Sequence, residues 1–411
     1  MKNFEEEVMW ARQQFPALNR MHSGNPLVYF DGPAGTQVPK AVIEAVVHCY
    51  NSHNANIHGQ FITSRETDQL LHEARDAVGA LLGANSSTNI SFGANMTTLN
   101  FSLSKAIAKA LNPGDQVLIT QLDHEANRGP WLTLEKDGIS IREIRVNHDG
   151  TLDHKDLENK MSTRTRLLAM GMASNLLGTV NDFNLARKLT SEVGAWLLLD
   201  AVHYVPHFSL DVQANKTDFL LCSAYKFYGP HIGILYCDDG TLDSLDADRL
   251  RTQDQRAPFR IETGTLNFPA IAGVTAAIHF LAGFGEGDNL RMRVISAMNR
   301  ISAYEYSLAR LLYDELSRIQ EVTIYGPRFD TPLRAPTISF TVARKSPREV
   351  ARCLGEAGIC TWDGHFYAIR PVEILGLANT GGLVRIGISM YNTMNEVERL
   401  IDEVQHIAGD S

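Results

Sequence analysis

The chain is organised around residues 219–230, which read FLLCSAYKFYGP. The apolar run at the start of this segment predicts a buried strand, which ends in Ser223, Tyr225 and Lys226 before a turn at Gly229. A lysine at such a place is unusual, because a buried ammonium is rarely left without a partner. Partial desolvation lowers the pKa of an amine and makes it a nucleophile suited to Schiff-base chemistry. The alternative is a lysine that extends along the strand to solvent.

The composition is that of a globular protein. The chain has 411 residues, 44% of them hydrophobic and 21% charged, which is enough for a large core and two domains. The net charge of −9 argues against nucleic-acid binding, which requires a basic surface. The five cysteines form no C-x-x-C pair, so a reducing compartment is favoured over a disulfide framework or a zinc ribbon, and no metal site is predicted. No signal-peptide pattern or membrane-length apolar run is found, so we expect a cytoplasmic protein without a membrane partner.

Short apolar strands alternate with helices through most of the chain. The expected strands are residues 28–31, 89–92, 116–120, 140–146, 167–173, 196–200, 218–223 and 232–236. The expected helices are residues 4–15, 39–50, 66–82, 97–111, 129–136 and 184–193, with a polar loop at 51–65. This alternation predicts an α/β fold with a mostly parallel sheet covered on both faces. Ligands bind such sheets beyond the carboxyl ends of the strands.

The pattern changes after about residue 280. Expected helices at residues 290–320, 347–357 and 395–407 are mixed with strands at 337–342, near 360 and at 383–389. This mixture predicts a smaller α+β domain. We therefore expect an N-terminal arm (residues 1–20), a large domain (21–280) and a small domain (281–411).

Three polar side chains at strand ends give Lys226 a chemical setting. Asp200 follows an apolar strand, and a carboxylate there can keep a pyridine nitrogen protonated, or instead cap the next turn. His124, in the strand exit TQLDHEAN, is placed to stack on an aromatic cofactor and move protons, or is a surface-loop histidine. Asn175 can donate to a phenolate oxygen, or form an Asx turn.

A candidate phosphate site lies between a strand and a helix, at Ala94-Asn95-Met96. Small residues let backbone N–H groups approach an anion, and a helix N-terminus attracts negative charge. The segment is not a GxxxxGK[ST] loop, so binding of a nucleoside triphosphate is unsupported. With Ser223 and Tyr225 as further donors, and with the amine, carboxylate and imidazole above, the groups together describe a site for pyridoxal 5′-phosphate (PLP).

These residues resemble the class V branch of the fold-type I aminotransferases, and most of all the cysteine desulfurase group. The matching segments are YFDGPAGT (29–36), DHEAN (123–127), SNLLGT (174–179), LDAVH (199–203), SAYKFYGP (223–230), ETGT (262–265) and MYNT (390–393). The resemblance implies a PLP enzyme with a seven-stranded, mostly parallel sheet, and a homodimer with shared active sites. It implies that Thr265 reaches the phosphate of the neighbouring subunit.

The resemblance also implies how a substrate is bound. Arg385 is expected to bind the α-carboxylate of an amino acid, because a guanidinium pairs with a carboxylate through two hydrogen bonds; the alternative is a surface ion pair. Ala34, Asn175 and Trp362 are further candidates for substrate binding.

The chain departs from the desulfurases where sulfur chemistry is expected. Those enzymes carry a catalytic cysteine in a motif similar to R-x-G-H-x-C-A, whereas residues 362–368 read WDGHFYA here. Tyr367 stands at the cysteine position and Trp362 at the arginine position, and a phenol cannot form a persulfide as a thiolate does. Cys360, in an expected strand, is the remaining candidate nucleophile.

Two further replacements lie near the expected cofactor. His203 stands where glutamine is usual and Tyr225 where histidine is common. Both keep a hydrogen-bonding group, so we expect cofactor binding to survive them.

The intact residues Lys226, Asp200 and Arg385 allow removal of the α-proton of an amino acid. The predicted activity is therefore a C–S lyase, which eliminates the sulfur of a cysteine derivative while Tyr367 protonates the leaving thiol or shapes the pocket. Transamination and isopenicillin N epimerase-like racemisation begin with the same proton removal and remain alternatives. A non-catalytic PLP-fold protein is the alternative of another class, against which the presence of Lys226 and Asp200 weighs.

Overall fold

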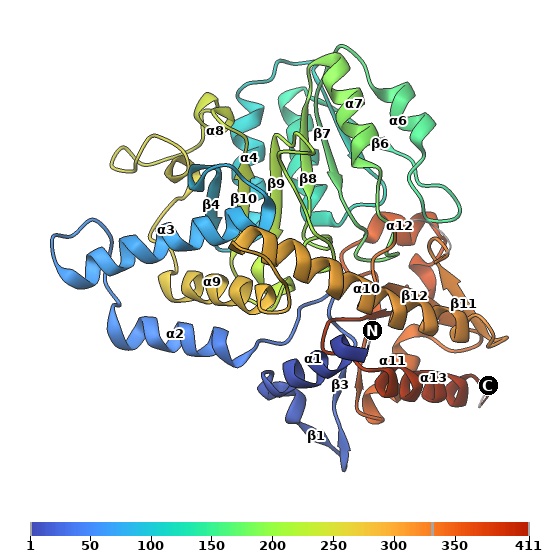
Figure 1. Cartoon of the computed structure of the whole chain (residues 1–411). Helices are drawn as coiled ribbons and strands as arrows, with labels where there is room; N and C mark the ends of the chain where they lie inside the picture. The colour runs from blue at the N-terminus through green and yellow to red at the C-terminus, as the bar shows by residue number, and fades with distance from the viewer. Residues whose placement is uncertain (1, 330–332, 410–411) are drawn as a thin grey trace.

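The computed structural model describes residues 2–329 and 333–409. Its main element is a seven-stranded sheet in the order β4-β10-β9-β8-β7-β5-β6 (Figure 1). The strands are β4 (Ile90–Gly93), β5 (Gln116–Thr120), β6 (Ser140–Ile144), β7 (Thr165–Gly171), β8 (Trp196–Asp200), β9 (Phe219–Ser223) and β10 (Gly233–Cys237). Only β10 runs against its neighbours, β4 and β9. The predicted mostly parallel α/β sheet is thus confirmed.

Both faces of the sheet are buried because apolar residues follow one another along each strand. In β8, Leu197 and Leu199 belong to one core and Leu198 to the other, since successive side chains point to opposite faces. The first core contains residues of α2 (Lys40–Ser52), α3 (Ile62–Leu82), α6 (His154–Lys160), α7 (Phe183–Val193) and α9 (Phe268–Ala282). The second contains residues of α4 (Met96–Ala108), α5 (Gly129–Leu132) and α8 (Thr241–Ser244).

Several helices differ from the sequence-based expectation, which also lacked α6. The expected loop at residues 51–65 is shorter, because α3 begins at Ile62. The expectation did not include α9, whose sequence is apolar around most of the helix although Ile271, Val274 and Ile278 are buried on one face and His279 is exposed. Because apolar residues also occupy the less buried face, the helix has little amphipathic contrast by which to recognise it.

The C-terminal part contains a four-stranded antiparallel sheet in the order β11-β12-β15-β14. Its strands are β11 (Val322–Tyr325), β12 (Thr337–Val342), β14 (Trp362–Gly364) and β15 (Leu383–Gly387). Its helices are α11 (Pro347–Glu356), α12 (Ile369–Ile374) and α13 (Met394–Gly409). These elements form the smaller α+β domain, with a core of its own.

The two domains are joined by more than one segment. The long helix α10 (Leu290–Leu316) contributes Val294 to Ile301 to the large core and Leu308 to Leu316 to the small one (Figure 1). The chain begins with α1 (Lys2–Gln13) and a short hairpin of β1 (Met21–His22) and β2 (Asn25–Pro26). The next strand, β3 (Val28–Tyr29), pairs with β13 (Ile359–Cys360).

The boundaries at residues 20 and 280 stay predictions. In the described part of the chain, no helix is both long and apolar enough to cross a membrane.

Candidate active site

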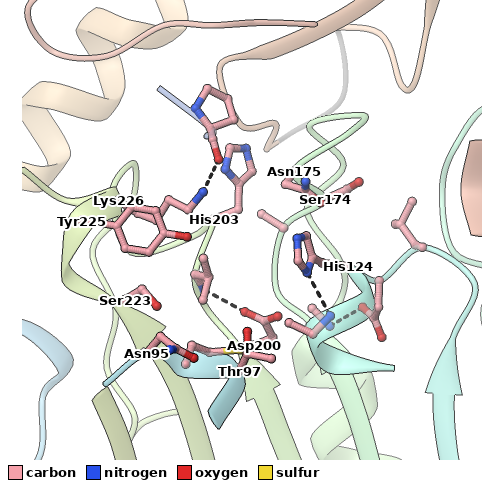
Figure 2. A pocket seen from close by; sticks show the side chains of 18 of the residues that line it. Asn95, Thr97, His124, Ser174, Asn175, Asp200, His203, Ser223, Tyr225 and Lys226 are labelled. Atoms are coloured by element: carbon pink, nitrogen blue, oxygen red, sulfur yellow. Dashed lines mark hydrogen bonds between the residues drawn. The ribbon is translucent and has the colours of Figure 1, made fainter. Parts of the chain in front are cut away.

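The carboxyl ends of three parallel strands meet at one cavity of about 700 Å³ (Figure 2). Asp200 is the last residue of β8, His124 lies in the loop after β5, and Lys226 ends the 3₁₀ turn η5 (Ala224–Lys226) that directly follows β9. Figure 2 shows Lys226 and Tyr225 on one side of the cavity and His124 and Asn175 on the other. Parallel strands bring their carboxyl ends to the same edge, so residues far apart in the sequence face one cavity.

Lys226 points into this cavity and does not extend to the outer surface. Its Nζ donates to the backbone carbonyl of Pro33 and, at 3.0 Å, to that of Ala34. Desolvation and the positive charge of Arg385 lower the pKa of Lys226 to about 7, against the opposing effect of Asp200. A large fraction of this amine is therefore neutral, and so nucleophilic, at neutral pH.

Two buried carboxyl groups lie at the strand ends. Asp200 accepts from the N–H of Val202 at 3.0 Å, and burial raises its pKa to about 6, opposed by this bond and by Lys226. Asp123 accepts from the N–H of Gly171 at 2.6 Å, and burial raises its pKa to about 7. The turn-capping bond that was the alternative for Asp200 therefore exists, and its carboxyl group also lines the cavity.

His124 faces the same cavity as a neutral imidazole. Its Nδ1 accepts from the N–H of Ala126 at 3.0 Å, which places the ring proton on Nε2. Burial, together with the positive charges of Lys226 and Arg385, lowers the pKa of His124 to about 4. A neutral ring at this position suits stacking against an aromatic cofactor.

His203 is also buried at the cavity wall. Its Nε2 lies 2.9 Å from Oγ1 of Thr337, and burial followed by the charge of His207 holds the pKa of His203 well below its ordinary value. The side-chain amide of Asn175 donates to the carbonyl of Phe366 at 3.0 Å. Asn175 thus holds a loop of the small domain, and its donation to a cofactor oxygen stays a prediction.

The phosphate end of the predicted site lies at the N-terminus of α4. Asn95 caps this helix by accepting from the N–H of Thr98 at 2.9 Å, and the first N–H groups of a helix have no intrahelical partner. The cavity side of this end is lined by Asn95, Met96, Thr97, Ser223 and Tyr225. A Cβ at Gly233 would lie 2.2 Å from the carbonyl carbon of Asn95, so glycine is needed for β10 to pass this close.

The donor groups along the cavity fit PLP. A buried carboxyl group can form a hydrogen bond with the ring nitrogen, and an imidazole can stack on the ring face. A partly neutral lysine can react with the aldehyde, and a helix N-terminus can bind the phosphate. Ala94 and Thr265 line a separate cavity of about 950 Å³. Their predicted contacts with a cofactor phosphate stay predictions.

A wider cavity of about 1130 Å³ opens outward from Lys226 and His124. Arg385 of β15 lines it, is 3% exposed, and donates to the backbone carbonyl of Asn175 at 3.0 Å. Burial lowers the pKa of Arg385 to about 9, and the nearby carboxyl of Asp31 opposes this shift. Arg385 is thus buried in the cavity wall, as binding of a substrate carboxylate requires, and is not part of a surface ion pair.

The loop that departs from the desulfurase pattern borders this wider cavity. Trp362, Phe366 and Tyr367 line it, and Tyr367 is 67% exposed with its ring centroid 5.6 Å from that of His124. Ala34 lines the same cavity.

The cysteines lie elsewhere. Cys360 pairs with Tyr29 between β13 and β3, and burial and the charge of Asp31 raise its pKa. Within the described residues, no cysteine side chain lines either cavity.

Thr97 and Asn181 are among the cavity residues that were not singled out from the sequence. Thr97 lies in the first turn of α4 and borders both cavities. Asn181 donates to the carbonyl of Gly171 at 2.7 Å, while its buried Oδ1 has no partner among the described residues. Asn181 precedes a helix, where an Asn is ordinarily a cap, so the sequence carries no signal that it faces a cavity.

Comparison with known proteins agrees with this geometry. Residues 28–400 match the family described as Aminotransferase class-V. A cysteine desulfurase of Enterobacter sp. (strain 638) is 32% identical, over 97% of each chain. Among solved structures, the cysteine desulfurase CsdA of Escherichia coli has a TM-score of 0.85 and 26% identity, covering 97% of this chain and 98% of that one. The apo cysteine desulfurase of Thermococcus onnurineus NA1 has a TM-score of 0.87 and 26% identity, covering 98% of each chain.

The match extends over both domains and over the cavity residues that carry the predicted chemistry. The chain therefore belongs to the class V aminotransferase family and is a PLP-dependent enzyme similar to the cysteine desulfurases.

Proposed function

We propose that this enzyme breaks the C–S bond of a cysteine derivative by α,β-elimination, without a cysteine nucleophile. The observation that carries the proposal is the place of Tyr367, which borders the substrate cavity, whereas none of the five cysteines does so in the described chain. The similar proteins are named cysteine desulfurases, which supports a substrate derived from cysteine.

Bound PLP supplies an electron sink that stabilises negative charge on the α-carbon of an amino acid. The residues of the chain supply substrate binding and proton transfer. Arg385 binds and orients the α-carboxylate, and the neutral amine of Lys226 accepts the α-proton. Asp200 holds a proton on the ring nitrogen through a charged hydrogen bond.

The reaction balances without an oxidant. The Cα–H bond breaks and its proton goes to Lys226, and the Cβ–S bond breaks with its electron pair on sulfur. The sulfur takes a proton from water or from the phenol of Tyr367, which is exposed at the cavity mouth. Hydrolysis of the three-carbon product yields pyruvate and ammonia, so one substrate and one water give pyruvate, ammonia and a thiol.

The homodimer and the cytoplasmic location expected from the sequence remain proposals. The dimer is supported by the cavity that Thr265 and Ala94 line beside α4, since the resemblance to the desulfurases places a neighbouring subunit's phosphate at the Thr265 position.

The test is a substrate screen of the purified holoenzyme with cysteine, cystine and S-substituted cysteines. Release of equal amounts of pyruvate and thiol is expected. Accumulation of the aminated cofactor, reversed by a keto acid, would instead establish a transaminase, and loss of α-deuterium without loss of the amino acid would establish a racemase. A protein without visible cofactor absorbance, or one that keeps this absorbance in Lys226→Ala, would overturn the assignment of Lys226.

A further inference from the structure

The mouth of the substrate cavity carries two aromatic side chains, and the elimination itself requires no aromatic ring at either position. Trp362 and Tyr367 are 52% and 67% exposed, and both line the cavity that Arg385 and Lys226 close at its inner end. Exposed rings that line the same cavity mouth mark a binding surface when the backbone holds them in place.

The backbone beneath Tyr367 is held by the large domain, whereas Trp362 lies in β14, which pairs with β15. Phe366 and Tyr367 both have positive φ angles, 53° and 57°, which bulky residues rarely adopt. The carbonyl of Phe366 accepts from the side chain of Asn175 at 3.0 Å, and the carbonyl of Tyr367 accepts from the N–H of Glu125 at 2.7 Å. Strain that is maintained by such bonds is typical of binding and catalytic sites.

A salt bridge fixes the same segment a few residues later. Nε of Arg370 in α12 lies 3.1 Å from Oε2 of Glu143, which belongs to β6 of the large sheet. The aromatic loop is therefore tied to the large domain on both sides of Tyr367, which gives its ring a defined position beside His124.

The three rings have different surroundings. The guanidinium of Arg385 lies 4.2 Å from the ring centroid of Phe366, so that ring supports the carboxylate-binding residue. The ring of Tyr367 is tilted by 40° to His124. In the part of the chain that the structure describes, Trp362 makes no ring contact with another aromatic residue.

The charged side chains of the outer lining and of the segment after Tyr367 are paired. Glu125 forms a salt bridge with Arg128 at 3.2 Å, Arg370 pairs with Glu143, and His124 is neutral. The remaining small residues of this outer region, Ala34 and Ala126, offer only apolar side chains. Among the described residues that line this cavity, the charged side chains are Glu125, which is paired, and Lys226 and Arg385 at the inner end. A charged substituent at the mouth would therefore find no unpaired opposite charge in the lining, whereas a flat, uncharged group would find two aromatic faces.

We propose that the sulfur of the substrate carries a neutral aromatic substituent, which binds against Tyr367 and Trp362. This inference rests on the elimination proposed above and names the substrate class for the same site. Aromatic pairs change affinity by up to about tenfold beyond the burial of their area, so the two rings give a clear preference over an S-alkyl group.

The test uses analogues that cannot eliminate. In 2-amino-4-phenylbutanoic acid a methylene replaces the sulfur of S-phenylcysteine, and norvaline is the same replacement in S-methylcysteine. Titration of the holoenzyme, followed by the cofactor spectrum, is expected to show at least about tenfold tighter binding of the phenyl compound. Tyr367→Ala and Trp362→Ala should each reduce this preference several-fold, whereas Tyr367→Phe should keep it.

A matched control is Trp10→Ala, because Trp10 of α1 is 54% exposed, close to the exposure of Trp362, but lies outside the cavity. This variant should keep the wild-type preference. Equal affinity for the two analogues in the wild type, or a preference that survives both alanine variants in the mouth, would overturn the inference.

Turnover separates this inference from the proposed function. If the phenyl analogue binds preferentially but S-phenylcysteine yields neither pyruvate nor benzenethiol, elimination is overturned and aromatic recognition stands. If S-methylcysteine and S-phenylcysteine are cleaved with equal kcat/KM and the analogues bind equally, aromatic recognition is overturned and elimination stands.

Discussion

If Lys226 is the residue that bonds to PLP, its neutral fraction sets how fast the apoprotein captures the cofactor, because only the unprotonated amine attacks an aldehyde. With a pKa of about 7, half of the Lys226 amines are neutral at pH 7. A lysine with an ordinary pKa of about 10.4 would be neutral in roughly 0.04% of molecules at that pH. The structure therefore predicts capture on the order of a thousand-fold faster at pH 7 than for an unperturbed lysine in the same place.

The perturbation that tests this reasoning is Arg385→Leu. After desolvation, the charge of Arg385 is the largest cause of the lowered pKa of Lys226, so its removal should move the midpoint of the capture rate to higher pH. Asp31→Asn should move the midpoint to lower pH, since Asp31 acts in the opposite direction. Arg352→Leu, on the exposed face of α11, is the control and should not move it.

The assay is the rate at which visible absorbance appears when PLP is mixed with the apoprotein, from about pH 5 to about pH 10. The expected profile rises with pH and levels off above a midpoint near pH 7. A rate that still rises tenfold per pH unit through pH 9, or an Arg385→Leu midpoint equal to or below that of the wild type, would refute the assignment of a desolvated lysine.

Two further substitutions have expected outcomes. Arg385→Lys keeps the charge but loses the two-bond geometry, at a cost of roughly 1.5–3 kcal/mol, so KM for the amino acid should rise about 10- to 150-fold; an unchanged KM would contradict the assigned role. Glu262→Ala leaves the buried guanidinium of Arg75 without the two 2.8 Å bonds that it makes to Glu262, and should reduce the free energy of unfolding by about 3–5 kcal/mol in denaturant titrations. Glu356→Ala, in the exposed pair with Arg352, should change that energy little, and an equal loss in both variants would reject the argument.

The sheet was predictable because each central strand is a short apolar run bounded by turns. Residues 116–120 and 196–200 were expected as strands and have these bounds as β5 and β8. The helix α9 was not expected, since apolar residues also occupy its less buried face, and α10 ends at Leu316 where the expectation extended to residue 320. The first miss follows from weak amphipathic contrast, and the second lies at a helix end, which periodicity within one segment does not fix.

The residues that line the cavity also divide into those that the sequence predicted and those that it did not. Lys226, Asp200 and His124 could be recognised because each follows a strand and carries a group that a pyridine cofactor uses. Thr97 and Asn181 could not, because a polar residue at a helix start has an ordinary role as a cap. Their position at the cavity depends on how α4 and α7 pack on the sheet.

The amino-acid sequence by itself determined the fold class and the cofactor and predicted the lysine that bonds to it, because these depend on residue types at the ends of recognisable strands. Only the tertiary structure decided what surrounds Tyr367. The loop that carries this residue is held by Asn175 and Glu125, and Arg385 reaches the same cavity from β15. Those contacts join segments about 200 residues apart, and such pairings arise from packing between domains, which no local pattern in the chain encodes.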